Sequence, residues 1–322
     1  MRYVPFSETH LADVCALWNR QWEKSFPMRE KLLRQNCVED KNVLAAGSYA
    51  AIDESNGTLV GFVVSKIWQD VTPGFDFGRK DGWIHALLVD PRYRGRGVGS
   101  ELLSRAEAAL RESGAQQIHL GNDFHWRMFP GVPGPDPETR RWFERRGYTY
   151  ASPIYDLFRR YEAGESEPLP EMEGITFRLA NPGDRERVVS FMHRSFPGRW
   201  DYQTVQYWER GGTGREFVLC EKEGEIIGFC RINDAASPIL AQNIYWAPLF
   251  QDELGGAGPL GIDEKFRGRG YGLAVVKAGI HFLRQRGIRN IVIDTTAFID
   301  FYGKLGFQVW KQYGRFRKTL RQ

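Results

Sequence analysis

The stretch Arg94-Gly95-Arg96-Gly97-Val98-Gly99 recurs as Arg267-Gly268-Arg269-Gly270-Tyr271-Gly272 in this chain of 322 residues. Each copy follows an apolar run that ends in an aspartate, and each opens an amphipathic stretch. A strand, a glycine-rich turn and a helix start, in that order, form a site for phosphate, because glycine lets the backbone approach the anion and the N–H groups point at it. The two copies predict a duplicated domain with a duplicated site for a nucleotide-type cofactor.

The spacing of the repeat excludes two commoner phosphate loops. The dinucleotide fingerprint needs a third glycine, and Ser100 and Leu273 stand at that position instead. The nucleoside-triphosphate loop needs Gly-Lys-Ser/Thr, which follows neither apolar run. A single glycine-rich hexapeptide can also be a tight turn with no ligand. Its duplication in one strand-to-helix context argues against that simpler interpretation.

The remaining pattern, Arg-x-x-Gly-x-Gly, resembles the pyrophosphate-binding motif of the GNAT acetyltransferase superfamily. The resemblance implies acetyl-coenzyme A as cofactor, up to one molecule per domain, and no metal. It assigns cofactor binding to the turns and to the strands that precede them. The residues are Leu88, Val89, Arg94, Gly95, Arg96, Gly97, Val98 and Gly99 in the first half, and Gly261, Ile262, Arg267, Gly268, Arg269, Gly270, Tyr271 and Gly272 in the second.

Composition narrows the class of protein. The net charge of +4 is modest for this length, which makes nucleic acid an improbable partner. The chain contains no run of eighteen apolar residues and does not begin like a signal peptide, so we expect no membrane span. The four cysteines form no Cys-x-x-Cys pair and are expected to be free thiols in a reducing compartment, which predicts a cytoplasmic protein.

The repeat also predicts the domain organisation. Residues 1–160 form a first domain, the polar, proline-containing segment 161–174 is a linker, and residues 175–322 form a second domain. Each half shows a strand, helices, a hairpin, the strand before the motif, the motif helix, another strand, a helix and a final hairpin. That order predicts an α/β layered fold with a mixed central sheet and flanking helices. It also matches the GNAT fold, whose fourth and fifth strands splay apart around the cofactor.

The segment from Thr295 to Phe307 resembles a late motif of the same superfamily. Tyr302 and Gly306-Phe307 match it, whereas Thr295 and Phe298 depart from it. The resemblance makes Tyr302 the candidate general acid for the leaving thiolate; the alternative is a core aromatic. Asp294 ends the predicted fifth strand and is the candidate base or amine anchor. Asp294 or Thr295 can instead cap the following helix.

The first half differs at the decisive position, because Phe143 stands where the second half has Tyr302. It also carries a proline- and glycine-rich loop, Asp123–Pro137, that we expect to be ordered and to pack, with the acceptor side of the second domain as one possible partner. His85 can be a base, but a structural role is favoured. Several tryptophans can line a sugar site, with core packing an equal alternative: Trp83, Trp126, Trp142, Trp200, Trp208 and Trp246.

The sequence therefore predicts an acetyl-coenzyme A-dependent N-acetyltransferase that acts on the primary amine of a small molecule, with catalysis in the second domain. The resemblance extends to mycothiol synthases and bacterial glucosaminide N-acetyltransferases, which makes an amino sugar the first candidate acceptor. Two alternatives stay open. One is an acetyltransferase for protein lysines or N-termini, and the other is a non-catalytic acetyl-coenzyme A sensor or scaffold. The sequence does not indicate an oligomeric state.

Overall fold

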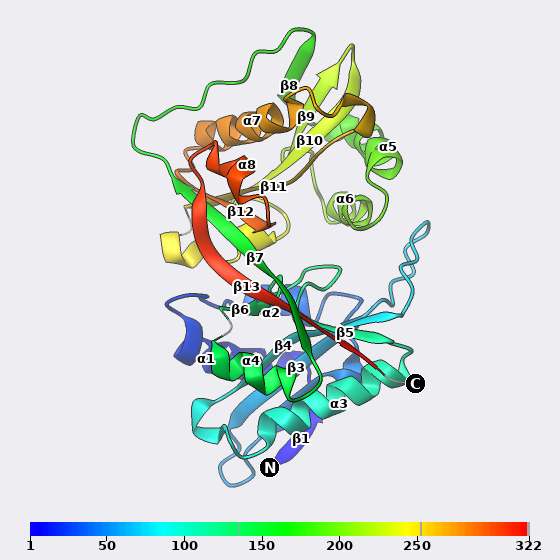
Figure 1. The fold of residues 1–322 in the computed structure, drawn as a ribbon, viewed down its shortest axis with the longest axis vertical. Coiled ribbons are helices and arrows are strands. Elements are labelled where there is room, and N and C mark those ends of the chain that lie inside the picture. The colour runs from blue at the N-terminus through cyan, green and yellow to red at the C-terminus, as the bar shows by residue number, and fades with distance from the viewer. Residues whose placement is uncertain (135, 252, 321–322) are drawn as a thin grey trace. The chain divides into compact units, whose positions relative to one another are not determined.

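A computed structural model describes residues 1–134, 136–251 and 253–320. The chain forms two compact units, one made of Met1–Ile154 and the segment from Lys311, the other of Tyr155–Trp310 (Figure 1). In each unit helices pack on a mixed sheet, so the predicted α/β fold is confirmed. The second unit differs from the predicted range 175–322 at both ends. It begins at Tyr155 and so includes the segment predicted as a linker, and the segment from Lys311 groups with the first unit.

The first unit follows the predicted order of elements. Its strands run β1–β2–β3–β4–β5–β13 across the sheet, with β4 and β5 parallel and the other pairs that are resolved antiparallel. The strands are β1 (Arg2–Pro5), β2 (Tyr49–Ile52), β3 (Leu59–Ile67), β4 (Asp81–Val89), β5 (Gln117–Leu120) and the short β6 (Val132–Pro133). The helices are α1 (Leu11–Trp22), α2 (Glu30–Cys37), α3 (Val98–Glu112) and α4 (Pro137–Glu144).

The second unit repeats this plan. Its strands run β8–β9–β10–β11–β12–β7, and β11 and β12 are its parallel pair. The strands are β8 (Ile175–Leu179), β9 (Phe217–Lys222), β10 (Glu225–Asn233), β11 (Leu254–Ile262) and β12 (Asn290–Thr296). The helices are α5 (Arg185–Ser195), α6 (Arg199–Glu209), α7 (Tyr271–Gln285) and α8 (Ile299–Gly303).

The prediction of a final hairpin in each half is wrong. Each half ends in one long strand, β7 (Thr149–Arg160) or β13 (Gln308–Thr319), that continues from one unit into the other. β7 pairs with β12 from Arg159↔Ile291 to Leu157↔Ile293, and β13 pairs with β5 at Lys318↔Ile118. The edge beside each fifth strand is therefore filled by the strand of the other repeat.

The segment predicted as a linker is held against the second unit. Tyr161 is fully buried in the core of that unit, and the guanidinium groups of Arg159 and Arg284 lie 4.0 and 5.1 Å from the centre of its ring. The Arg284 side chain donates to the carbonyl of Glu165, and the carbonyl of Glu167 accepts a hydrogen bond from His281. The side chains of α7 thus bind the backbone of the linker and fix its course.

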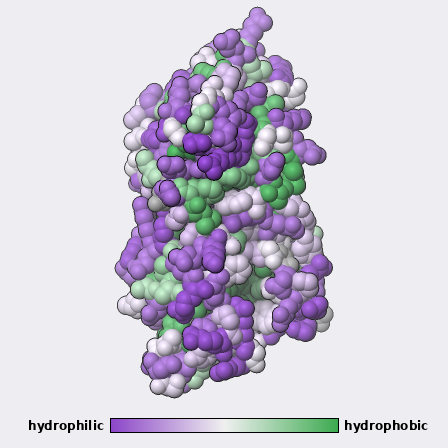
Figure 2. All heavy atoms as spheres, turned by 90° about the vertical axis from the view of Figure 1, so that its left-hand side faces the viewer, coloured by the Kyte–Doolittle hydropathy of each residue, from purple (hydrophilic) through white to green (hydrophobic). Residues whose placement is uncertain are grey.

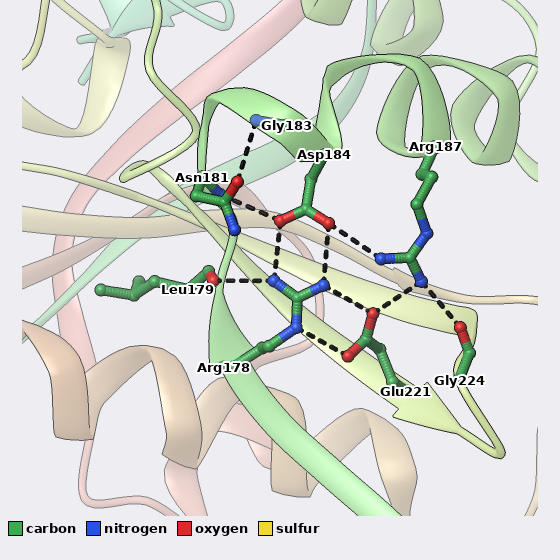
Figure 3. A network of polar contacts seen from close by, with 8 residues as sticks. All are labelled: Arg178, Leu179, Asn181, Gly183, Asp184, Arg187, Glu221 and Gly224. Atoms are coloured by element: carbon green, nitrogen blue, oxygen red, sulfur yellow. Dashed lines mark hydrogen bonds and ion pairs between the residues drawn. The ribbon is translucent and has the colours of Figure 1, made fainter.

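An ion-pair network joins β8 and β9 to the first turn of α5 (Figure 3). Arg178 on β8 forms paired hydrogen bonds to Asp184, at 2.7 and 2.8 Å, and to Glu221 on β9, at 2.7 and 2.8 Å. Arg187 on α5 donates to both carboxylates. Bidentate guanidinium–carboxylate pairs of this kind fix geometry as well as energy, so the network sets where α5 begins relative to the sheet.

The described helices include none that is both long enough and apolar enough to cross a membrane. Hydrophilic residues predominate on the face shown in Figure 2. Few large apolar side chains are exposed among the described residues, and one of them, Phe298, precedes α8. All four cysteines are free.

Candidate active site

The two Arg-Gly-Arg-Gly turns have the same backbone. Gly97 and Gly270, which precede α3 and α7, have φ values of 85° and 81°, and Gly95 and Gly268 have 72° and 79°. These values lie in the left-handed region, which glycine enters without strain. In both units an aspartate before the turn, Asp90 or Asp263, accepts a backbone hydrogen bond two residues on.

The turns leave room for an anion. A Cβ atom added at Gly95, Gly97 or Gly268 would meet nothing within 4 Å. Residues 94–97 and 267–270 are exposed, and Val98 and Tyr271 begin the helices whose first N–H groups have no partner within the helix. Open space, free N–H groups and the positive end of a helix fit a pyrophosphate in both units.

The first arginine of each turn has a structural contact. Nε of Arg94 donates to the carbonyl of Val89 at 3.2 Å, and Nε of Arg267 donates to the carbonyl of Ile262 at 3.0 Å. These matched bonds tie each turn back to its strand. The third residue of each turn contacts a ring: the guanidinium groups of Arg96 and Arg269 lie over the rings of Tyr93 and Phe266.

The parallel strands in each unit separate toward the turn. β11 pairs with β12 from Leu254↔Asn290 to Gly256↔Val292, and the pairing stops before Gly258. β4 pairs with β5 from Asp81↔Gln117 to Ile84↔Leu120, and the pairing stops before His85. Beyond these points the described strands give β11 no partner on its β12 side, at Gly261 and Ile262, and give β4 none on its β5 side, at Leu88 and Val89. A free strand edge can pair with an extended ligand, as in β-augmentation.

Tyr302 lies on α8, in the core that forms on the α7 side of the sheet. Its side chain is buried in the core that includes Val275, Val276 and Ile293. Its hydroxyl has no hydrogen-bond partner among the described residues, whereas its ring contacts Phe301 and Phe307. Burial, with the nearby Cys230 and Asp294, raises the pKa of the phenol well above its usual range. The group therefore stays protonated, as a proton donor must.

Asp294 approaches the splay from the opposite face. Its neighbour Ile293 belongs to the α7-side core, and side chains alternate along a strand, so Asp294 faces the other way with Val292. Its Oδ2 accepts from the Thr295 hydroxyl at 3.1 Å. Asp294 does not cap α8, because the cap-type bond to the Phe298 N–H comes from Thr296 at 3.0 Å. The Thr295 N–H is bound by Asp156 instead.

In the first unit Phe143 is a core residue between Trp142, Tyr148 and Phe316. His85 is fully buried, and its Nδ1 lies 2.8 Å from Asp123 Oδ2. Burial opposes ionisation of Asp123, but Lys66 and His85 outweigh it and hold the pKa of that carboxyl below its usual range. These contacts favour the structural interpretation of His85.

The loop after β5 packs inside the first unit. Trp126, Met128 and Phe129 are buried, and the Phe129 ring stacks on Trp18 at 5.7 Å. Nζ of Lys66 donates to the carbonyls of His125 and Trp126. Pro135, in the same loop, lies outside the described residues. Among the other tryptophans, Trp208 and Trp246 are buried, whereas three are partly exposed: Trp83, Trp142 and Trp200.

Sequence reasoning missed the polar residues that flank β11. Asn243 lies over Gly256, where an added Cβ would come within 2.0 Å of its side chain. Arg231 and Asn233 lie on β10, the other neighbour of β11. One signal was available, since an arginine inside the otherwise apolar run Ile226–Ile232 and an asparagine directly after it need partners when the strand is buried.

Solved structures resemble the whole chain. A glucosamine N-acetyltransferase region of a fungal multi-domain GH3 β-N-acetylglucosaminidase aligns with a TM-score of 0.86 and 26% identity, over 98% of this chain and 38% of that one. A GCN5-related N-acetyltransferase from Sphaerobacter thermophilus aligns with a TM-score of 0.72 and 18% identity, over 100% of this chain and 96% of that one. A tandem GNAT protein from the clavulanic acid biosynthesis pathway aligns with a TM-score of 0.69 and 14% identity, over 99% of this chain and 98% of that one. The fold is that of a tandem acetyltransferase.

Sequence comparison gives the family. The profile of the Acetyltransferase (GNAT) family matches residues 11–129 and 185–307, and the chain belongs to that family. The mycothiol acetyltransferase of Nocardia farcinica is 27% identical over 92% of this chain and 95% of its own. The mycothiol acetyltransferase of Thermobispora bispora is 27% identical over 70% of this chain and 72% of its own. The protein is therefore an acyltransferase.

Proposed function

We propose that this chain transfers the acetyl group of acetyl-coenzyme A directly to the primary amine of a small molecule, at the splay of β11 and β12. The observation that carries the proposal is a buried phenol, Tyr302, in the core on the α7 side of the sheet, together with a carboxylate, Asp294, that follows Ile293 of that core on β12 and therefore faces the other side. An acid and a base are the two groups that this reaction requires.

The residues present fit the cofactor. The turn at Arg267–Gly270 can hold its pyrophosphate, and the free edge of β11 at Gly261 and Ile262 can pair with its extended arm. Acetyl-coenzyme A supplies an acyl group activated as a thioester. The matching turn at Arg94–Gly97, with Leu88 and Val89, supports a second binding site in the first unit. Because Phe143 replaces the phenol there, we propose that the first unit binds without catalysing.

We assign one proton transfer to Asp294 and the other to Tyr302, which lie on opposite faces of the sheet. Asp294 accepts a proton from the acceptor amine as its nitrogen forms the new bond to the acyl carbon. Tyr302 gives the proton of its hydroxyl to the sulfur as the carbon–sulfur bond breaks. N–H groups on the free edge of β11 can donate to the carbonyl oxygen, on which negative charge develops.

An amino sugar is the acceptor that we propose. The fungal neighbour is a glucosamine N-acetyltransferase region and the relatives are mycothiol acetyltransferases, which supports a small-molecule acceptor. The four free thiols fit a reducing compartment, and we place the enzyme in the cytoplasm.

The test is an acetyl-transfer assay with the full chain across amino sugars, polyamines, amino acids and peptides. We expect turnover of amino sugars and its loss in Asp294→Asn, by about 10²–10⁴-fold. A preference for peptides would support the protein acetyltransferase alternative. Tight binding of acetyl-coenzyme A with no turnover of any amine would support the sensor or scaffold.

A further inference from the structure

Arg231 on β10 carries a guanidinium group with no hydrogen bond or ion pair to any described residue. Its Nε is buried without a partner. The group lies over the rings of Tyr207 on α6, at 5.0 Å, and Phe217 on β9, at 5.6 Å. A guanidinium has five N–H donors, and leaving buried donors unpaired costs free energy. Tyr207 and Phe217 stack on the group and leave its N–H donors for another partner.

Register places Arg231 beside the splay. β10 pairs with β11 at Cys230↔Leu260 and Ile232↔Ala257, so β11 carries an extra residue opposite Arg231. Asp294 flanks the same part of β11 from the other side, two residues beyond Val292↔Gly256. Arg231 and Asp294 also share a face, because Cys230 points toward Gly279 on α7, whereas Phe229 contacts Phe196 and Trp200.

A second unpaired group lies two residues along the same strand and on the same face. Oδ1 of Asn233 is buried without a partner, and Asn233 is fully buried. The orientation of its amide follows from its neighbours. The Gly258 carbonyl can only accept, so Asn243 presents its Nδ2 to that carbonyl at 3.2 Å. Oδ1 of Asn243 then accepts from Asn233 Nδ2 at 3.2 Å, which leaves Asn233 Oδ1 unpaired.

The two unpaired groups are complementary to a hydroxyl group. Arg231 offers only donors, and Asn233 Oδ1 offers only an acceptor. A hydroxyl accepts from the first and donates to the second, whereas an aliphatic chain satisfies neither. We propose that Arg231 and Asn233 form a subsite that binds a hydroxyl group on the carbon next to the reacting amine. The inference deepens the proposed function, on which it rests, and specifies the acceptor as a vicinal amino alcohol such as an amino sugar.

The test compares three amines that differ in hydroxyl groups: cyclohexylamine, trans-2-aminocyclohexanol and glucosamine. For the wild-type chain we expect kcat/KM for the aminocyclohexanol to exceed that for cyclohexylamine. In Arg231→Met, kcat/KM should fall about 10- to 100-fold for the two hydroxylated amines, the range for losing a hydrogen bond to a charged group. It should change less than about twofold for cyclohexylamine. Ratios of variant to wild type cancel the different basicities of the amines.

Three controls separate this role from a structural one. Arg185→Met alters an exposed arginine at the start of α5 and should leave all three ratios near one. In Arg231→Met the KM for acetyl-coenzyme A should be unchanged and the unfolding temperature should not fall, and Arg231→Lys should restore part of the selectivity. Asn233→Leu should lose the same selectivity. Equal losses for all three amines, or no loss for any, would overturn the proposal.

Failure of the proposed function gives a different pattern. If the wild-type chain acetylates no amine, binding of N-acetylglucosamine is measured by calorimetry in wild type and Arg231→Met. Binding that weakens in the variant supports the hydroxyl subsite even without catalysis. Absent or unchanged binding overturns it.

Discussion

Tyr302 shows what burial does to a single side chain. Burial is the main cause of its raised pKa, and the charges of Cys230 and Asp294 add to it. A phenol that keeps its proton above neutral pH can serve as a donor throughout the working range. The same burial makes the hydroxyl costly to place without a partner, and the sulfur of the leaving group is the partner that we propose.

We expect Tyr302→Phe to lower kcat by about 10²–10⁴-fold, because it removes the proton donor and keeps the ring. The KM for acetyl-coenzyme A should stay nearly constant. In wild type, ionisation of this phenol should cause no loss of activity as pH rises to about 10, since its pKa is raised. Stopped assays of thiol release across pH measure both effects. Tyr155→Phe, at a partly buried position of the same core, is the matched control. Wild-type kcat in Tyr302→Phe would show that the phenol only packs.

Among the elements of the site, the glycine turns are the part that the two units share most closely. Both have the same left-handed glycines, the same aspartate and the same arginine bond to the preceding strand. Identical backbones argue for identical ligands, because the N–H groups of the turn recognise the anion.

We expect wild type to bind two equivalents of acetyl-coenzyme A in calorimetry, and Gly97→Val and Gly270→Val each to remove one. Valine at either position is strained by the positive φ and fills the open space of the turn. Only Gly270→Val should abolish turnover. Gly164→Val, at another exposed left-handed glycine, controls for backbone strain alone. A wild-type stoichiometry of one would restrict binding to one unit.

The network around Arg178 makes a pH-dependent contribution to stability. Hydrogen bonds from Arg178 lower the pKa of Asp184 to about 2, despite burial that opposes ionisation. A carboxyl whose pKa is lower in the folded state stabilises the fold above its unfolded pKa, near 4, and that contribution is lost as pH falls toward 2.

Asp184→Asn should therefore destabilise the protein by about 2 kcal/mol at pH 7 and by progressively less below pH 4. Urea unfolding of wild type and variant at several pH values measures the difference. Glu171→Gln, at an exposed carboxylate in the linker, should change stability by less than about 0.5 kcal/mol. A difference that does not depend on pH would exclude the ionised carboxylate as its cause.

At the scale of the whole molecule, the exchanged strands couple the two repeats. The C-terminal strand β13 contributes Phe316 to the core of the first unit, and Leu320 directly after the strand joins the same core. β7 contributes Leu157 to the core of the second unit. The core of each unit therefore includes residues from the other repeat. We infer that a cut at the linker removes core residues from both units, so that separate fragments 1–174 and 175–322 should fold poorly.

Phe316→Ala tests this coupling in the intact chain. Its ring contacts Phe143 and Tyr150, so its loss should destabilise the first unit by about 3–5 kcal/mol, although the residue lies near the C-terminus. Hydrogen exchange should show the loss of protection in α3 and β4. Val309→Ala, at an exposed position of the same strand, should have little effect. Loss of protection confined to the second unit would contradict the contribution of β13 to the core of the first unit.

The sequence by itself determined the repeat, the family, the α/β fold, the two turns and the asymmetry between Tyr302 and Phe143. Each of these depends on the identity and spacing of residues that are close together in the sequence. Tertiary structure decided the rest. The exchange of β7 and β13 could not be read from the sequence, since a long strand carries no sign of which edge it will join. Arg231, Asn233 and Asn243 come together only when β10, β11 and the segment before β11 meet. Pairing between distant strands selects such neighbours, and no local pattern records it.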